Sequence, residues 1–179
     1  MKAETIKLRA LTNADIKKTL FWHNQKDIQN LYSGHPFPVN IEMEELWYSK
    51  ILTSNYPTTI FGIELIKESE LIGISLIKNI NNINRNAEFA IYIGEDQHRG
   101  KGYSKEATIK TLKFAFFQLG LKRLYLNVLE KNNVAISLYE KIGFKKEGLL
   151  RSAIFKNNQF ENEILMAILK EEFEQNDEL

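Results

Sequence analysis

The chain has 179 residues, the length of one ordinary domain with a hydrophobic core of its own. It is 44% hydrophobic and 26% charged, with 9 Gly and 3 Pro, a composition that excludes disordered, collagen-like and coiled-coil chains. The 24 Lys and Arg nearly balance the 23 Asp and Glu, so the net charge of +1 gives no reason to expect a nucleic acid or a membrane as partner. We therefore expect a single domain over residues 1–179.

The chain contains no cysteine. Disulfides, thiolate metal sites and mechanisms that hold an acyl group on an enzyme thiol are therefore excluded. The N-terminal residues have no apolar segment typical of a signal peptide, and no stretch of the chain approaches the ~18 apolar residues that span a bilayer. These features predict a cytoplasmic protein.

The first part of the chain is predicted to form a strand and two helices. Residues 4–9 alternate in polarity as a strand does, and Thr12 is a good N-cap for a helix that runs to about residue 30. Residues 33–39, SGHPFPV, are typical of a loop. A second helix is expected after Asn40, another good N-cap.

The period of the apolar residues then changes to two. Residues 59–66, 70–80 and 86–93 are rich in Ile, Leu and Phe, and the polar segments 67–69 and 81–85 separate them. This pattern predicts an antiparallel meander of three strands.

The second half of the chain alternates helix and strand. Apolar residues at helical spacing predict a helix that ends at Gly120 and a shorter one that ends at Gly143. The pair Asn157-Asn158 predicts a hairpin turn, and the acidic tail 171–179 is expected to be solvated. The strands in this half are predicted over residues 123–129, about 148–155 and about 160–169.

The strand–helix–strand unit over residues 86–129 requires a right-handed crossover, and so a parallel pair of strands. The predicted fold is therefore α+β, with one twisted, mixed and mostly antiparallel sheet of about seven strands and about four flanking helices.

An anion-binding loop is predicted where the strand 86–93 leads into the next helix. Gly100 and Gly102 let the backbone approach a ligand closely, and the helix N-terminus presents unpaired N–H groups. A dinucleotide fingerprint would need a glycine where Lys105 stands, and a P-loop would need Gly-Lys-Ser or Gly-Lys-Thr. The loop therefore predicts a different diphosphate ligand, near the cations of Arg99, Lys101 and Lys105.

Residues 97–102, QHRGKG, resemble the acetyl-CoA pyrophosphate loop of GNAT N-acetyltransferases. A second block, Asn127 with NNVAISLYEKIGF over residues 132–144, is similar to the family's Asn-x-x-Ala-x-x-Leu-Tyr-x-Lys-x-Gly-Phe segment. The likeness extends over nearly the whole chain and is to the branch with ribosomal-protein N-terminal and spermidine acetyltransferases. The chain departs from the spermidine enzymes after its first helix, where Ser33-Gly34-His35 stands in place of acidic residues.

The resemblance implies an acetyl-CoA-dependent N-acetyltransferase with a GNAT-like fold. Acetyl would pass directly from the CoA thioester to a primary amine, of a protein N-terminus or of a small molecule. A polyamine or an aminosugar is the alternative acceptor, and a CoA-binding sensor without turnover is the non-enzymatic alternative. Acetyl-CoA is the expected co-substrate and no metal is expected, since His23 and His98 lack metal-ligand spacing with carboxylates. A homodimer is also considered.

The family's strand before the pyrophosphate loop holds the pantetheine, and one of its backbone N–H groups can meet the tetrahedral oxyanion. The residues that the resemblance assigns to acetyl-CoA are Ile91, Tyr92, Ile93, Gln97, His98, Arg99, Gly100, Lys101, Gly102, Tyr103, Ser104, Lys105, Asn127, Asn132, Tyr139 and Lys141.

Tyr139 matches the family's proton donor for the leaving thiolate, and its alternative role is that of a half-buried core aromatic. An attacking amine must also lose a proton. Glu88 is the candidate base, or else a strand-end Glu paired with Arg85 or a lysine. His35 and a water chain are the other candidate bases.

Acceptor contacts are expected from the helix–loop–helix that covers the acceptor groove in the family. For Phe37 and Trp47, core packing is the favoured alternative. The candidate acceptor-binding residues are Trp22, His35, Phe37, Glu44 and Glu88.

Overall fold

The computed structural model describes residues 4–31, 37–53 and 58–176. Its strands are β1 (Ile6–Arg9), β2 (Thr59–Leu65), β3 (Glu70–Asn81), β4 (Asn86–Ile93), β5 (Arg123–Leu129), β6 (Lys145–Lys156) and β7 (Gln159–Leu169). Its helices are α1 (Ile16–His23), α2 (Lys26–Leu31), α3 (Ile41–Thr53), α4 (Tyr103–Lys113), α5 (Asn133–Ile142) and α6 (Lys170–Glu174), with 3-10 turns η1 (Asn13–Asp15) and η2 (Asp96–His98) and a π-helical turn η3 (Phe114–Gln118).

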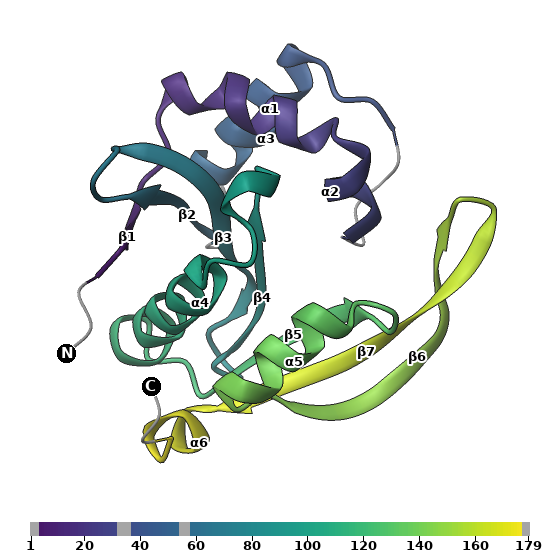
Figure 1. Ribbon diagram of the computed structural model, residues 1–179. Helices are drawn as coiled ribbons and strands as arrows, with labels where there is room; N and C mark the ends of the chain where they lie inside the picture. Colours follow the sequence, from purple (N-terminus) through teal and green to yellow (C-terminus); the bar gives the residue numbers. More distant parts are fainter. Residues whose placement is uncertain (1–3, 32–36, 54–57, 177–179) are drawn as a thin grey trace.

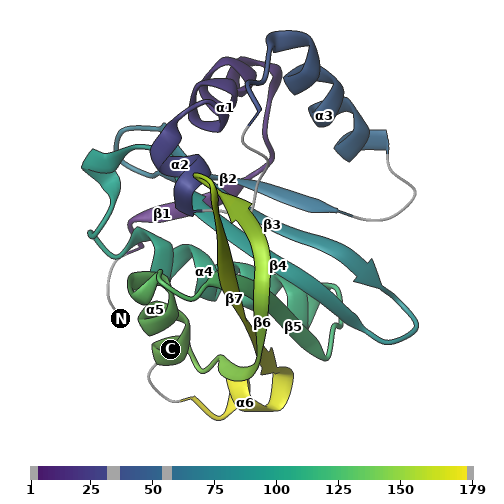
Figure 2. The same cartoon turned by 90° about the vertical axis from the view of Figure 1, so that its right-hand side faces the viewer.

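All seven strands form one sheet in the order β1-β2-β3-β4-β5-β7-β6 (Figure 1). The predicted meander is confirmed, because β2, β3 and β4 pair antiparallel in sequence order. Helices α1–α3 lie on one face of the sheet, and α4 and α5 lie on the opposite face (Figures 1 and 2). The predicted α+β fold with a mixed, mostly antiparallel sheet is therefore confirmed.

The predicted parallel pair is formed by β4 and β5, but it is short. Asn86, Ala87 and Glu88 pair with residues 123–125, and no later residue of β4 pairs with β5. Both strands continue beyond this point, β4 to Ile93 and β5 to Leu129. The two strands therefore splay apart from Phe89 onward, and Figure 1 shows them diverging.

Alternation along β4 divides its side chains between two clusters. Phe89 and Ile91 belong to the main core, together with Leu112 of α4 and Ile136 of α5. Tyr92 belongs to a second core with residues of α1 and α3. Because neighbouring residues of a strand point to opposite faces, Glu88 lies on the Tyr92 face, which we call the acceptor face.

The prediction of one long first helix is wrong, because this part of the chain forms η1, α1 and α2 instead. Asn24 ends α1 because its side chain makes three hydrogen bonds with backbone, donating to the carbonyls of Leu20 and Val39 (3.1 and 2.8 Å) and accepting from the N–H of Val39 (2.9 Å). A side chain that binds nearby backbone in this way competes with continuation of the helix.

The chain's C-terminal part also differs from the expectation of a solvated tail. Residues up to Glu174 continue as α6, and Phe173 is only 5% exposed. Its ring packs on Phe116 with 5.5 Å between centroids. One aromatic residue among acidic neighbours is therefore enough to dock this segment on the core. The predicted hairpin turn is confirmed, with Asn157 and Asn158 at φ of 49° and 61°.

None of the helices within the described ranges is both long and apolar enough to cross a bilayer. The cytoplasmic location and the absence of nucleic-acid and membrane partners stay predictions.

Candidate active site

The loop between β4 and α4 presents bare backbone at a helix N-terminus. Gly100 and Gly102 have φ of 73° and 88°, a region that favours glycine, and Gly102 is the N-cap of α4. A Cβ atom added at either glycine would meet no atom within 4 Å, so the space in front of both is open. No side chain caps α4, so its first N–H groups face that space, as in anion sites at helix N-termini.

The side chains of this loop do not all face the open space, although we expected their cations to lie near a diphosphate. Arg99 turns inward, donating from Nε to the carbonyl of Ile93 (3.1 Å) and from Nη2 to that of Gly94 (3.2 Å), and it pairs with Asp96. Lys101 is exposed beside the glycines. Arg99 therefore shapes the loop through these contacts with its backbone and with Asp96.

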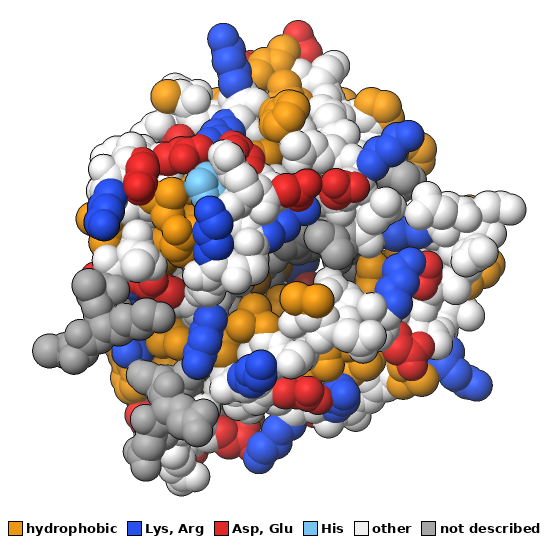
Figure 3. Space-filling view, viewed as in Figure 1, with side chains coloured by type: hydrophobic (Ala, Val, Ile, Leu, Met, Phe, Trp, Pro, Cys, Tyr) orange, Lys and Arg blue, Asp and Glu red, His pale blue; other side chains and the backbone are white. Residues whose placement is uncertain are grey.

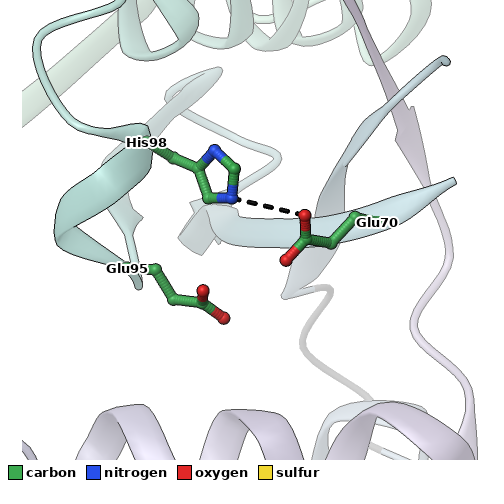
Figure 4. Close-up of side chains that lie close together, drawn as sticks. All are labelled: Glu70, Glu95 and His98. Carbon is green, nitrogen blue, oxygen red and sulfur yellow. Dashed lines mark ion pairs between the residues drawn. The ribbon is translucent and has the colours of Figure 1, made fainter. Parts of the chain in front are cut away.

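His98 also turns away from the open space, and it joins a charged cluster with Glu70 of β3 and Glu95 (Figure 4). Its Nε2 lies 3.3 Å from Oε2 of Glu70. One ligand atom from each of the three residues lies within 4.8 Å of the others, which is the spacing of a metal site. Lys18 of α1 already supplies a cation there, with Nζ 3.0 Å from Glu70 and 2.9 Å from Glu95. Glu95 and His98 are three residues apart, but Glu70 and Lys18 come from β3 and α1, so the sequence did not reveal this cluster.

Tyr139 lies at the splay between β4 and β5. Its side chain is 7% exposed and packs against Phe89, the first residue of β4 beyond the paired segment, and against Phe144. Burial raises the pKa of Tyr139 above its usual value, so the phenol keeps its proton at neutral pH. A neutral phenol at this position can donate a proton to a leaving thiolate.

The other residues of the second block hold α5 or face solvent. Asn132 is the N-cap of α5, and its Oδ1 accepts from the N–H of Ala135 at 3.2 Å. Asn127 is exposed on β5, and Lys141 is exposed at the end of α5.

Glu88 stands on the acceptor face where the splay begins. Lys78 lies 2.8 Å from its Oε1, and the amide of Asn79 donates to its Oε2 at 2.9 Å. The alternative of a strand-end Glu paired with a lysine is thus realised, with Lys78 as the lysine. Arg85 instead donates to the carbonyl of Gly120 at 2.9 Å.

The tip of the β6–β7 hairpin reaches α2 across the acceptor face. Lys156 donates to the carbonyl of Gln29, and Asn157 donates to the side chain of Asn30 at 3.2 Å. Figure 2 shows the hairpin tip beside α2. Burial lowers the pKa of Lys156, and the charge of Lys131 acts in the same direction.

Figure 3 shows the surface hollowed between β4 and α5.

The residues expected to bind the acceptor lie in different environments. Trp22 is fully buried and belongs to the second core, and His35 lies outside the described residues. Phe37 is 68% exposed, so the expectation that it packs in the core is wrong, whereas Trp47 does pack against the second core. Glu44 is 1% exposed and bound to other side chains.

Glu44 forms a chain of polar contacts that sequence reasoning missed. Its Oε2 lies 2.7 Å from Nδ1 of His23, and its Oε1 accepts from the hydroxyl of Thr19 at 2.6 Å. Nε2 of His23 lies 3.3 Å from the hydroxyl of Tyr92 on β4. His23 and Glu44 are 21 residues apart, so no local pattern relates them.

A splayed pair of strands, a backbone anion site and a buried tyrosine define an acyl-CoA-dependent transferase of the GNAT class. The model of the acetyltransferase (GNAT) domain family matches residues 5–145, and the chain belongs to that family. The chain is 33% identical over 166 residues to the spermidine N(1)-acetyltransferase of Vibrio cholerae, which covers 93% of this chain and 94% of that protein. The resemblance to the branch with spermidine acetyltransferases is therefore confirmed.

Solved structures agree with this family. The spermidine N-acetyltransferase of Vibrio cholerae in complex with CoA and spermine superimposes with a TM-score of 0.89 at 30% identity, covering 96% of this chain and 99% of that chain. The same enzyme in complex with manganese ions superimposes with a TM-score of 0.82, covering 97% of each chain. The protein is an acetyl-CoA-dependent N-acetyltransferase of amines. That it needs no metal stays a prediction.

Proposed function

We propose that the acceptor is a polyamine or a closely similar aliphatic polycation. The observation that carries this proposal is the likeness over nearly the full chain to an enzyme whose structure holds CoA and spermine. Glu88 and Glu163 add two carboxylates on the acceptor face, because Ile164 on the neighbouring position of β7 packs against the main core. Carboxylates favour an acceptor with several positive charges.

We assign the two ends of the reaction as follows. Acetyl-CoA lies with its pyrophosphate on the backbone at Gly100 and Gly102, and its pantetheine follows the edge of β4 that splays away from β5, toward Phe89. An N–H of that edge donates to the oxyanion formed by attack of the amine. As the C–S bond breaks, Tyr139 gives its proton to the sulfur. Glu88 exchanges its contact with Lys78 for the positive charge of the acceptor, which it orients.

An acceptor panel tests the proposal. Spermidine, glucosamine and a peptide with a free N-terminus are each incubated with acetyl-CoA, and thiol release is followed. We expect the highest kcat/KM for spermidine and a loss of that activity in Tyr139→Phe, which excludes a contaminating enzyme. A higher kcat/KM for glucosamine or the peptide would overturn the polyamine assignment. Binding of acetyl-CoA without turnover of any acceptor would favour the sensor alternative.

We also propose a homodimer through the β6–β7 hairpin. Strand β6 is an edge of the sheet, and Leu149, Leu150, Phe155 and Phe160 of the hairpin are 39–68% exposed. An edge strand with exposed apolar side chains favours pairing with another chain. Light scattering should give twice the chain mass, and Phe160→Lys should halve it. A monomeric wild type would rule this interface out.

A further inference from the structure

The carboxylate of Glu44 determines which nitrogen of His23 can accept a proton. Glu44 is 1% exposed, and a carboxylate can only accept hydrogen bonds. Its contact of 2.7 Å with Nδ1 therefore places the imidazole proton on Nδ1 when the ring is neutral. Nε2 then carries a lone pair, and it points toward β4. The hydroxyl of Thr19 binds the second carboxylate oxygen and holds Glu44 in this orientation.

Tyr92 occupies the position in front of Nε2. Burial raises the pKa of Tyr92 well above its usual value, and the charge of Glu44 acts in the same direction. The phenol is therefore a neutral donor, and its distance of 3.3 Å from Nε2 is long for a hydrogen bond. A cationic N–H donor would bind Nε2 more strongly than this phenol does.

The position of Tyr92 places this nitrogen on the acceptor side of the splayed strand. Tyr92 shares its face of β4 with Glu88, and the opposite face of β4 packs in the main core against α4 and α5. His23 keeps 26% of its side-chain surface exposed, although it lies edge-on to Trp47 at a centroid distance of 5.3 Å. The imidazole is thus partly accessible to solvent, and its Nε2 faces β4.

We propose that His23 is the base that removes the proton from the acceptor amine, with Glu44 as its positioning residue. The ammonium nitrogen approaches Nε2 and transfers one proton to it, directly or through one water. The resulting imidazolium is neutralised by Glu44 across the Nδ1–H contact. The freed lone pair of the amine forms the C–N bond, the C–S bond breaks, and the thiolate takes its proton from Tyr139. The nitrogen loses its second proton as the amide forms, and that proton returns through water to the phenolate of Tyr139. This assignment rests on acetyl transfer to an amine and holds for any acceptor of that kind.

The test compares two acceptors that differ in the protonation of the attacked nitrogen. One is the amine that the wild type acetylates best, and the other is its difluorinated analogue, of which a much larger fraction is neutral at pH 7. In His23→Gln we expect kcat for the first amine to fall by ~10²-fold, the range of a general base, and kcat for the analogue to change by less than about threefold. Glu44→Gln should show the same selective loss in smaller degree.

Tyr92→Phe is the matched control, because it removes the phenol that contacts Nε2 but leaves the base. It should preserve the ratio of the two rates found in the wild type. Melting temperatures and acetyl-CoA affinities of all variants report on folding and the cofactor site. An equal loss for both acceptors in His23→Gln, or no loss for either, would overturn the proposal. Should His23→Gln not fold, a wild-type ratio of the two rates in Glu44→Gln would also overturn the proposal. A wild type that acetylates no amine would instead contradict the proposed function.

Discussion

The ring of Tyr139 stands edge-on to the ring of Phe89, with 6.3 Å between the centroids and 86° between the planes. Phe89 is the first residue of β4 that no longer pairs with β5. The main core therefore holds the phenol at the point where the two strands separate, which is where we propose that the thioester lies.

Tyr139→Phe keeps the ring and its packing but removes the proton donor. We expect the rate of acetyl transfer to fall by ~10²-fold or more, with acetyl-CoA affinity nearly unchanged. Single-turnover kinetics and calorimetric titration measure the two quantities. The control is Tyr48→Phe, which deletes a buried hydroxyl bound to the carbonyl of Leu11 at 2.7 Å and should lower stability by ~1 kcal/mol without slowing transfer. If the two variants behave alike, Tyr139 is a core aromatic and not the proton donor.

Gly102→Asp should weaken acetyl-CoA binding by roughly tenfold or more, because it puts a negative charge at the N-terminus of α4. Gly102→Ala separates the effect of the charge from that of backbone strain, since it adds a side chain at φ of 88° without a charge. Gly148→Asp is the matched control, as a Cβ there also meets no atom within 4 Å and the residue lies on β6. Calorimetric titration decides, and wild-type affinity in Gly102→Asp would show that the loop is not the pyrophosphate site.

Gly94 lets α1 pack against the end of β4. A Cβ atom at Gly94 would lie 2.0 Å from Cε2 of Trp22, a buried ring that cannot move without opening the second core. Gly94→Ala should therefore lower the free energy of unfolding by about 1–3 kcal/mol. Gly148→Ala, with open space around it, should leave stability within about 0.5 kcal/mol of the wild type. Urea unfolding measures both, and equal midpoints would contradict the packing argument.

Asp15 links stability to pH. Burial alone would raise its pKa, but hydrogen bonds from Arg9 and Thr12 outweigh burial, and the pKa of Asp15 lies below its usual value. The stabilisation is therefore fully present above the unfolded pKa of ~3.9 and is lost as pH falls through the lower folded value. Asp15→Asn should be less stable than the wild type at pH 7, with a smaller difference near pH 3.

Urea unfolding at both pH values tests this prediction. The exposed Glu68, in the turn between β2 and β3, provides the control, because Glu68→Gln should follow the wild type at both. A stability difference for Asp15→Asn that does not shrink on acidification would mean that Asp15 acts through packing rather than charge.

Local patterns in the sequence determined most of the fold and the cofactor loop. Period-two runs predicted the meander, and the crossover rule predicted the parallel pair of β4 and β5, because both follow from backbone geometry. The glycines at 100 and 102 were readable because they precede a helix and let the backbone approach a ligand, and their positive φ agrees with glycine at both positions. The break at Asn24 and the docking of Phe173 escaped prediction because tertiary contacts of single side chains decided them.

The acceptor side was decided by the tertiary structure alone. His23 meets Glu44 and Tyr92 from three different elements, and the hairpin tip meets α2 across 127 residues of chain. Such contacts leave no periodic trace in the sequence, because they depend on how helices and strands pack rather than on their own geometry. Lys18, Glu70 and the pair Glu95 and His98 gather for the same reason, since the packing of α1, β3 and the loop after β4 brings together side chains that lie far apart in the chain.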